Sequence, residues 1–539
     1  MKSRTLITIG LIFLALSLTL AACGGQPAPA PAPEVVCPEP EPCPDLVCPD
    51  PVPCPEPVVA DVPFEEEWIN SPHADAAARA FTYWDSADPA QIPETCAKCH
   101  STHGFLDFLG VDGSVFGEVN APAAIGTTVQ CIACHNDVTA AMTSVVFPSG
   151  IELAGLGDEA RCMQCHQGRS SMVQVDAAIE NAGLTGDDDT VSADLAFINI
   201  HYYAAAATRF GSEVKGGYEY AGMSYDPRFD HVVGYDTCTS CHNPHTLEVK
   251  VEECSVCHTN VASLEDVRGI RMAASLVDYD GDGDISQGVQ VELEGLQAKL
   301  MQVIQAYATE VAGVAIGYNS QSHPYFFIDG DESGEIEEAE ANRDNRYVSF
   351  TPRLLKAAYN YQITKKDPGG FAHGGKYLIQ LLYDSITDLN TAIATPVDMT
   401  NAHRDDPGHF AASTGAFRHW DEDGLVPGGC AKCHTADGLP QFLFEASQAR
   451  DGVSGVNVAT HPSSGFNCAT CHSDVSTFEL FEVNNVRFPG GAILTFGEGV
   501  SSNLCINCHQ GREANATVQA AIRRADVGPD EVSAALSFR

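Results

Sequence analysis

Eight copies of one short pattern constrain this chain more strongly than any other feature of its sequence. The pattern is Cys-x-x-Cys-His, and it uses sixteen of the 21 cysteines. Its two thiols lie one helical turn apart, where they can bond the edge of a porphyrin, and the histidine that follows can reach the iron. The pattern therefore predicts eight covalently attached c-type haems. The predicted thioether cysteines are Cys96, Cys99, Cys131, Cys134, Cys162, Cys165, Cys238, Cys241, Cys254, Cys257, Cys430, Cys433, Cys468, Cys471, Cys505 and Cys508, and the predicted proximal iron ligands are His100, His135, His166, His242, His258, His434, His472 and His509.

Structural zinc is the alternative for such cysteine pairs. Zinc ribbons also use Cys-x-x-Cys pairs, but they do not need a histidine directly after each pair. The spacing therefore favours haem c over zinc.

The charge balance excludes one broad class of partner. The chain has 539 residues, with 29 lysines and arginines against 72 aspartates and glutamates, and its formal net charge is −43. Nucleic-acid phosphates are bound by basic patches, so we expect no nucleic-acid partner. Aromatic residues are only 8% of the chain and glycines number 47, which is lean for a large core made of side chains alone. We expect haems to fill much of the interior.

The first residues predict export. Residues 1–22 have a basic start, an apolar run and small residues at the end, which is typical of a secretory signal. The sequence Leu20-Ala21-Ala22-Cys23 resembles a bacterial lipobox, which implies lipidation of Cys23 and a chain anchored to the membrane, facing the periplasm or the cell exterior. The alternative is an ordinary signal peptide with an incidental cysteine. Residues 23–60 are rich in proline and acidic residues, which predicts a semi-rigid stalk. Its cysteines Cys37, Cys43, Cys48 and Cys54 remain unassigned between disulfides and a metal.

Two parts of the chain are copies of each other. Residues 61–262 form a predicted module with five haem motifs, and residues 401–539 repeat its first three. Val191-Ser-Ala-Asp-Leu-Ala-Phe197 answers Val532-Ser-Ala-Ala-Leu-Ser-Phe538, and in the first copy two more motifs follow that point. We therefore expect the second module to be a truncated copy, and ten haems in a chain that continues past Arg539.

The segment between the copies, residues 263–400, has no cysteine and predicts calcium binding. Asp329, Asp331, Ser333, Glu335, Glu337 and Glu340 match the ligand positions of an EF-hand loop. A second candidate contains Asp278, Asp280, Asp282 and Asp284, but Val289 stands where its last glutamate belongs. Helical spacing follows in residues 291–311, 354–361 and 377–389. An acidic surface loop without metal is the alternative.

The histidines outside the motifs decide what the haems can do. An electron carrier closes the second face of each iron, whereas a catalytic haem leaves it open. The first module has five spare histidines for five haems, and the whole chain has only eight methionines, so bis-histidine ligation is the economical prediction. The predicted distal ligands are His73, His103, His201, His231 and His245 in the first module and His409 and His461 in the second. His323 and His373 of the middle segment could also reach a neighbouring module, and the roles of His323, His373, His403 and His419 remain open.

Together the lipobox, the motif clusters and their spacing resemble the multihaem c-type cytochromes of extracellular electron transfer. The layout is nearest to the lipid-anchored decahaem outer-surface cytochromes. The resemblance implies electron transfer between other redox proteins and an extracellular or periplasmic acceptor. Those cytochromes carry β-barrel domains, whereas this middle segment is predicted to be helical. The expected fold is mostly α-helical and irregular with little β, with haem-packed modules and a helical EF-hand-like insert. A multihaem reductase of the nitrite, hydroxylamine or tetrathionate type and a subunit of a cytochrome filament are the alternatives, and the lipid anchor disfavours the filament.

Overall fold

A computed structural model describes residues 62–232, 234–271, 275–448 and 456–537. The predicted signal peptide, the lipidation site Cys23 and the whole predicted stalk lie outside these ranges. None of the described helices combines the length and the apolar character needed to cross a membrane. Residues Pro63–Arg539 form one unit by their contacts, and the predicted boundaries at 262 and 400 stay predictions.

The haem-motif regions consist of short helices joined by irregular chain. Each motif begins on, or overlaps, a helix of one or two turns, which is enough to place two cysteines on the same face. In the first region the helices are α1 (Glu65–Ile69), α2 (Arg79–Thr82), α3 (Glu94–His100), α4 (Thr102–Phe108), α5 (Cys131–Cys134), α6 (Asp137–Ala140), η1 (Gly157–Glu159), α7 (Ala160–His166), α8 (Met172–Asn181), α9 (Ala205–Val214), α10 (Cys238–Cys241), α11 (Val251–Cys254) and α12 (Leu264–Arg268).

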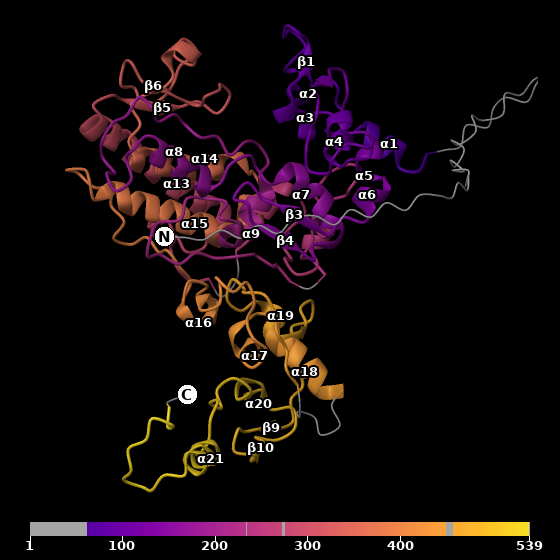
Figure 1. Cartoon of the computed structure of the whole chain (residues 1–539), viewed down its shortest axis with the longest axis vertical. Coiled ribbons are helices and arrows are strands. Elements are labelled where there is room, and N and C mark those ends of the chain that lie inside the picture. Colours follow the sequence, from indigo (N-terminus) through magenta and orange to yellow (C-terminus); the bar gives the residue numbers. More distant parts are fainter. Residues whose placement is uncertain (1–61, 233, 272–274, 449–455, 538–539) are drawn as a thin grey trace, which may run out of the picture. The chain divides into compact units, whose positions relative to one another are not determined.

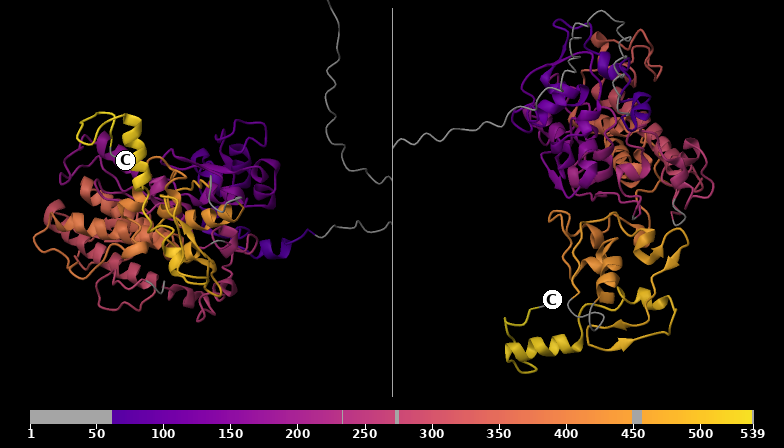
Figure 2. Two further views of the ribbon diagram at one scale, coloured as in Figure 1. Left: turned by 90° about the horizontal axis from the view of Figure 1, so that it is seen from below. Right: turned by 90° about the vertical axis from the view of Figure 1, so that its right-hand side faces the viewer.

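The second haem-motif region repeats this pattern. Its helices are η4 (Gly408–Phe410), α16 (Gly415–Arg418), α17 (Ala431–His434), α18 (Gly438–Gln448), α19 (Cys468–Cys471), α20 (Ser502–Cys505) and α21 (Asn515–Ala525). Helix α21 belongs to the yellow part of the chain in Figure 2, and none of its residues is buried.

Strands are few and short among the described residues. They form two-stranded antiparallel ribbons: β1 (Gln91–Ile92) with β2 (Ala123–Ala124), β3 (Ser144–Val146) with β4 (Glu152–Ala154), β5 (Ile316–Tyr318) with β6 (Phe326–Ile328), β7 (His472–Asp474) with β8 (Glu479–Leu480), and β9 (Val486–Arg487) with β10 (Ile493–Leu494). The expectation of a mostly helical and irregular chain with little β is confirmed.

One pair of ribbons shows how closely the two copies agree. The ribbons β3–β4 and β9–β10 turn at Gly150 and Gly491, whose φ angles are 85° and 88°. In both turns the glycine N–H donates to the carbonyl of a phenylalanine three residues earlier, Phe147 or Phe488, at 2.8 Å. A side chain at either position would strain the left-handed backbone, so the two copies fold the same local sequence into the same turn.

Three long helices build the segment between the copies. Helices α13 (Val289–Tyr307), α14 (Pro352–Lys366) and α15 (Gly370–Asn390) pack on one another, α15 also packs on α9, and α14 contacts α8 (Figure 1). A π-helical turn, η2 (Ala308–Ala312), follows α13, and a 3-10 turn, η3 (Arg343–Asn345), precedes α14. Helix α13 buries residues at helical spacing, namely Leu293, Leu296, Leu300, Val303, Ile304 and Tyr307.

Buried polar contacts join these helices to the first haem-motif region. The Tyr377 hydroxyl accepts a hydrogen bond from the Gly217 N–H at 2.9 Å, and the Asn360 side chain accepts from the Tyr218 N–H at 2.7 Å. These bonds satisfy backbone groups that would otherwise be buried without partners. The helical segment is therefore bonded to the chain around the haem motifs, which brings its own side chains within reach of them.

Candidate haem-binding sites

Six of the motif histidines face a second histidine across a gap of nearly constant width. The partner comes from a different part of the chain in each case, and the angle between the two ring planes ranges from 3° to 79°. The ring centroids are 5.8 Å apart for His100 and His201, 6.2 Å for His135 and His245, 6.2 Å for His166 and His73, 6.4 Å for His242 and His373, 6.2 Å for His258 and His231, and 6.0 Å for His509 and His409.

This spacing fits two imidazoles that share one metal ion. A metal–imidazole bond is about 2.0 to 2.1 Å, so two rings on opposite sides of one iron have centres roughly 6.3 Å apart. Aromatic stacking alone would not hold the distance constant while the plane angle varies so widely. The motif cysteines also fit thioether attachment, since none of the sixteen is paired in a disulfide. The residues present therefore fit haem c.

The second ring nitrogen of five motif histidines is held by a backbone carbonyl. A carbonyl oxygen can only accept, so Nδ1 carries the proton and Nε2 is left free for a metal. The bonds run from His100 to Ala80 at 2.8 Å, from His166 to Tyr203 at 3.1 Å, from His242 to Leu247 at 3.3 Å, from His434 to Ala416 at 2.8 Å and from His472 to Phe478 at 2.7 Å.

Burial keeps two of the paired imidazoles, those of His73 and His201, in the neutral form that a metal requires. Burial, assisted by His166, lowers the pKa of His73 to about 4. Burial also lowers the pKa of His201 to about 4, with the nearby Arg169 and His100 acting in the same direction. A neutral imidazole offers a lone pair without first losing a proton, so His73 and His201 suit metal binding at neutral pH.

Two predicted distal ligands do not face a motif histidine among the described residues. His103 is exposed on α4. His461 directs its Nε2 toward two carboxylates, at 3.3 Å from Asp230 and 3.8 Å from Asp437. The fifth histidine of the first haem region is instead His373, which opposes His242. The match of five spare histidines to five haems favoured partners inside the first module over His373, whereas α15 packs on α9 and brings His373 from the middle segment.

Two motif histidines, His434 and His472, have no histidine partner in the described ranges. The counterparts of these two residues in the first copy are His100 and His135, which face His201 and His245. In the first copy both partners come after Phe197 in the sequence.

Direct contacts link motifs to one another. The Sγ atom of Cys165 in the third motif lies 3.9 Å from the Lys98 carbonyl in the first, and Cys508 lies 3.6 Å from the Lys432 carbonyl in the equivalent pair of the second copy. Cys257 in the fifth motif lies 3.7 Å from the carbonyl of Val475, just after the seventh motif. The motifs are therefore neighbours both within each copy and between the copies.

Comparisons with known proteins agree with this geometry. The family model for cytochrome c7 and related cytochrome c matches residues 83–167, which hold the first three motifs. The C-type polyheme cytochrome OmcB of Geobacter sulfurreducens, in strains PCA and DL-1, is 24% identical over 385 residues, covering 58% of this chain and 46% of that protein. The C-type polyheme cytochrome OmcC of strain PCA is 25% identical over 368 residues, covering 58% of this chain and 44% of that protein.

This chain is a multihaem c-type cytochrome. It spans less than half of the length of the curated relatives named above. No solved structure gives a significant match to the cytochrome.

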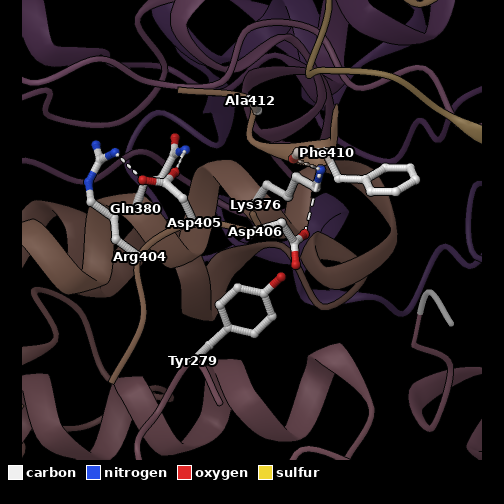
Figure 3. Close-up of a pocket in the computed structure, with 8 residues that line it drawn as sticks. All are labelled: Tyr279, Lys376, Gln380, Arg404, Asp405, Asp406, Phe410 and Ala412. Atoms are coloured by element: carbon white, nitrogen blue, oxygen red, sulfur yellow. Dashed lines mark hydrogen bonds and ion pairs between the residues drawn. The ribbon is translucent and has the colours of Figure 1, made fainter. Parts of the chain in front are cut away.

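A polar pocket next to one of the histidine pairs ties the cytochrome's helical segment to its second haem region. Figure 3 shows Gln380 of α15 reaching Asp405, before η4, and Lys376 of α15 reaching Phe410, the last residue of η4. Lys376 Nζ donates to the Phe410 carbonyl at 2.9 Å, and Gln380 donates to Asp405 at 2.8 Å. His409 directly precedes Phe410. Helix α15 therefore carries one histidine of a pair, His373, and anchors the backbone beside another.

The predicted calcium loop at residues 329–340 gathers carboxylates, although no helix flanks it. It lies between strand β6 and the 3-10 turn η3. Asp329 accepts from the N–H groups of Ser333 at 3.1 Å and Gly334 at 2.8 Å. Oxygen atoms of Asp329, Asp331 and Glu340 lie within 4.8 Å of one another. The Glu340 Oε2 atom is buried without a hydrogen-bond partner among the described residues.

The first acidic loop contains a carboxylate that sequence reasoning missed. Glu292, one turn into α13, joins Asp278 and Asp280 in a group of three buried carboxylates. Its Oε2 accepts from the N–H groups of Tyr279 at 2.9 Å and Asp280 at 3.1 Å, and its Oε1 pairs with Arg271. The only sequence signal for Glu292 was its place as an acidic residue in the first turn of the helix that follows the loop.

The other two acidic residues of the first loop bond locally. The Asp282 and Asp284 side chains accept from Gln287 and Ser286, and neither belongs to the carboxylate group. Burial raises the pKa of Asp280 to about 6.

The raised pKa of the buried Glu219 predicts that the stability of the fold depends on pH. Burial raises the pKa of Glu219 to about 7, although the Tyr377 hydroxyl donates to it at 3.0 Å. An acid with a raised pKa binds its proton more tightly in the folded state, so stability falls as pH rises from roughly 4.5 to about 7. Glutamine does not titrate. Over this pH range we therefore expect the unfolding free energy of Glu219→Gln to fall by roughly 2 to 3 kcal/mol less than that of the wild type.

Urea unfolding at a series of pH values measures this prediction, with Glu180→Gln, an exposed glutamate on α8, as the control. Wild-type and Glu219→Gln curves that fall equally between pH 5 and 7.5 would contradict it.

Proposed function

We propose that this cytochrome carries electrons along covalently bound haems whose irons are mostly closed by two histidines. The observation that carries the proposal is the constant spacing of the six histidine pairs, at 5.8 to 6.4 Å. A bound haem supplies reversible one-electron chemistry. In the proposal the cysteines fix each haem to the chain, the motif histidine binds one face of its iron, and the paired histidine closes the other. The proposed distal ligands are His73, His201, His231, His245, His373 and His409. His373 takes the place predicted for His103, and His461 is not among the proposed ligands.

The contacts between motifs support electron transfer between neighbouring haems. Contacts join the third motif to the first, the eighth to the sixth, and the fifth to the region of the seventh. The Glu159 carboxylate, next to the third motif's helix, also accepts from the Cys238 N–H of the fourth motif at 2.8 Å. We propose that electrons cross between the two haem regions where Cys257 meets Val475.

The proposed setting is the cell surface. The predicted lipid anchor at Cys23 would hold the cytochrome at the membrane, where it would exchange electrons with other redox proteins and an extracellular or periplasmic acceptor. The relatives named C-type polyheme cytochromes support a polyhaem electron carrier. The formal net charge of −43 favours partners with basic surfaces.

A multihaem reductase is the second candidate function. One observation favours it: His434 and His472 have no histidine partner among the described residues, and an iron with one open face can bind a small substrate such as nitrite or hydroxylamine.

Low-temperature electron paramagnetic resonance of the oxidised, haem-loaded cytochrome tests both functions. The electron-carrier proposal expects low-spin signals from at least six irons per chain. High-spin signals from more than two irons would contradict it. A stoichiometric high-spin iron together with turnover of nitrite or hydroxylamine would favour the reductase.

We further propose that the loop at residues 329–340 binds Ca²⁺ as a structural ion. Carboxylate oxygens are the ligands that Ca²⁺ prefers, and the number of charged ligands tunes its affinity. Asp329, Asp331 and Glu340 are the proposed core of the site, with Ser333, Glu335 and Glu337 as further predicted ligands. Asp278, Asp280 and Glu292 form a second, weaker proposed site in the first loop.

We expect Glu340→Gln to weaken calcium binding by roughly tenfold or more, because it removes a charged ligand. Isothermal titration calorimetry with CaCl₂ measures the affinity. Glu338→Gln makes the same charge change at an exposed position of the same loop and is expected to bind as the wild type does. Equal affinities for Glu340→Gln and wild type would contradict the proposed site.

A further inference from the structure

His373 differs from the other paired histidines in what holds its second ring nitrogen. Its Nδ1 lies 2.9 and 3.0 Å from the two carboxylate oxygens of Asp367. The motif histidines with a bonded Nδ1 donate to neutral backbone carbonyls instead. The Asp367 side chain is only 2% exposed, so water screens its charge weakly.

The junction of α14 and α15 fixes this contact. Asp367 follows the last residue of α14, and its carboxylate accepts from the Gly369 N–H at 3.2 Å. The backbone N–H of His373 donates to the Gly369 carbonyl at 3.0 Å. A Cβ atom at residue 369 would lie 2.7 Å from Cε1 of His373, so only glycine leaves room for the ring. The carboxylate and the imidazole are therefore held against each other by backbone geometry.

The carboxylate also fixes the orientation of the imidazole. A carboxylate accepts the Nδ1 proton, so Nε2 is the nitrogen left free, and the His373 ring lies opposite His242. Hydrogen bonding to a carboxylate makes an imidazole a stronger electron donor to a metal, and a buried negative charge favours the more positive state of that metal. Arg209, the nearby cation, is already paired with Glu159.

We propose that Asp367 is a positioning residue that acts through His373 to lower the reduction potential of the haem attached at Cys238 and Cys241. This inference rests on the proposed function, in which His242 and His373 are the axial ligands of that haem. The haem at the fourth motif would then have a more negative reduction potential than it would have with an uncharged residue at position 367. The fourth motif contacts the third through Glu159, so the tuned haem lies on the proposed route.

Asp367→Asn tests the inference, because the asparagine oxygen can still accept from Nδ1 while the charge is lost. Mutation of the partners of ligand histidines typically costs about 10- to 100-fold in metal affinity or activity. We expect the ferric-to-ferrous ratio of one haem to change about tenfold, which corresponds to about 59 mV for a one-electron couple. Spectroelectrochemical titration of the haem-loaded full chain measures the potentials, and Asp367→Glu is expected to stay close to wild type.

Asp384→Asn is the matched control. Asp384 lies on the same helix as His373, is 5% exposed and pairs with Arg404 at 2.8 Å. The variant removes a buried charge from α15 without touching a proposed ligand, so we expect no haem potential to shift. A shift of equal size in Asp384→Asn and Asp367→Asn would overturn the inference, because it would show a general effect of charge or folding.

His373→Ala separates failure of the inference from failure of the proposed function. If one iron becomes high-spin in His373→Ala while Asp367→Asn leaves every potential unchanged, the inference is overturned and the bis-histidine proposal stands. If every iron stays low-spin in His373→Ala, His373 is not a ligand, and the proposed ligand set and the inference both fail. One high-spin iron in His373→Ala together with one raised potential in Asp367→Asn supports both.

Discussion

Replacing His409 with alanine is expected to convert one low-spin iron per chain to high spin. His409 lies 6.0 Å from His509 between ring centroids, and the proposed haem between them would keep a single protein ligand. Loss of a strong axial ligand also raises the reduction potential, and we expect a shift on the order of 100 mV. Electron paramagnetic resonance and a redox titration of the haem-loaded protein measure the two effects.

The repeat supplies a matched variant in the first copy. His73 is the counterpart of His409 and lies 6.2 Å from His166, so His73→Ala is expected to open one haem in the same way. His103→Ala and His461→Ala serve as controls, because neither ring faces a motif histidine among the described residues, and both should leave the spin states unchanged. A new high-spin iron in either control, or none in His409→Ala, would contradict the proposed ligand set.

Replacing Glu292 with alanine is expected to cost about 3 to 5 kcal/mol of unfolding free energy. Glu292 is fully buried and pairs with Arg271, whose side chain is 8% exposed. Removing the carboxylate leaves a buried guanidinium and two backbone N–H groups, those of Tyr279 and Asp280, without their acceptor. Urea unfolding followed by far-ultraviolet circular dichroism measures the loss.

Glu294→Ala is the control for Glu292→Ala. Glu294 lies on the same helix and pairs with Arg268 at 2.6 Å, but both side chains are about half exposed. Exposed ion pairs contribute about 0 to 1 kcal/mol, so this variant should be nearly as stable as wild type. Combining Glu292→Leu with Arg271→Met is expected to restore much of the stability, because no buried charge then lacks a partner. Equal losses in Glu292→Ala and Glu294→Ala would be inconsistent with this account.

Much of the local structure could be predicted from neighbouring residues. A Cys-x-x-Cys-His sequence contains its own geometry, because residues three and four apart lie on one face of a helical turn. The same holds for the turns at Gly150 and Gly491, where similar short sequences form the same hairpin in both copies. The family and the mostly helical, irregular fold could be predicted because they depend on such local patterns.

The calcium loops show where local patterns stop being sufficient. The spacing of Asp329, Asp331 and Glu340 predicted the residues that lie together, since a twelve-residue loop closes on itself. In the first loop the pattern ended at Val289, and the carboxylate that joins Asp278 and Asp280 comes from Glu292 on the next helix. Its position depends on how α13 packs, which no loop motif encodes.

The sequence by itself determined which residues can attach haem and which segments are copies, because both are properties of residues close together in the chain. Only the tertiary structure decided which histidine faces which motif. His373 opposes His242, and Asp367 holds His373, because α15 packs on α9. The histidine count of the first module favoured His103 over His373, because the sequence alone does not show which helix of the middle segment packs against that module. Contacts between residues distant in sequence depend on how whole helices pack. That packing depends on the buried faces of all the helices involved, which no short stretch of sequence contains.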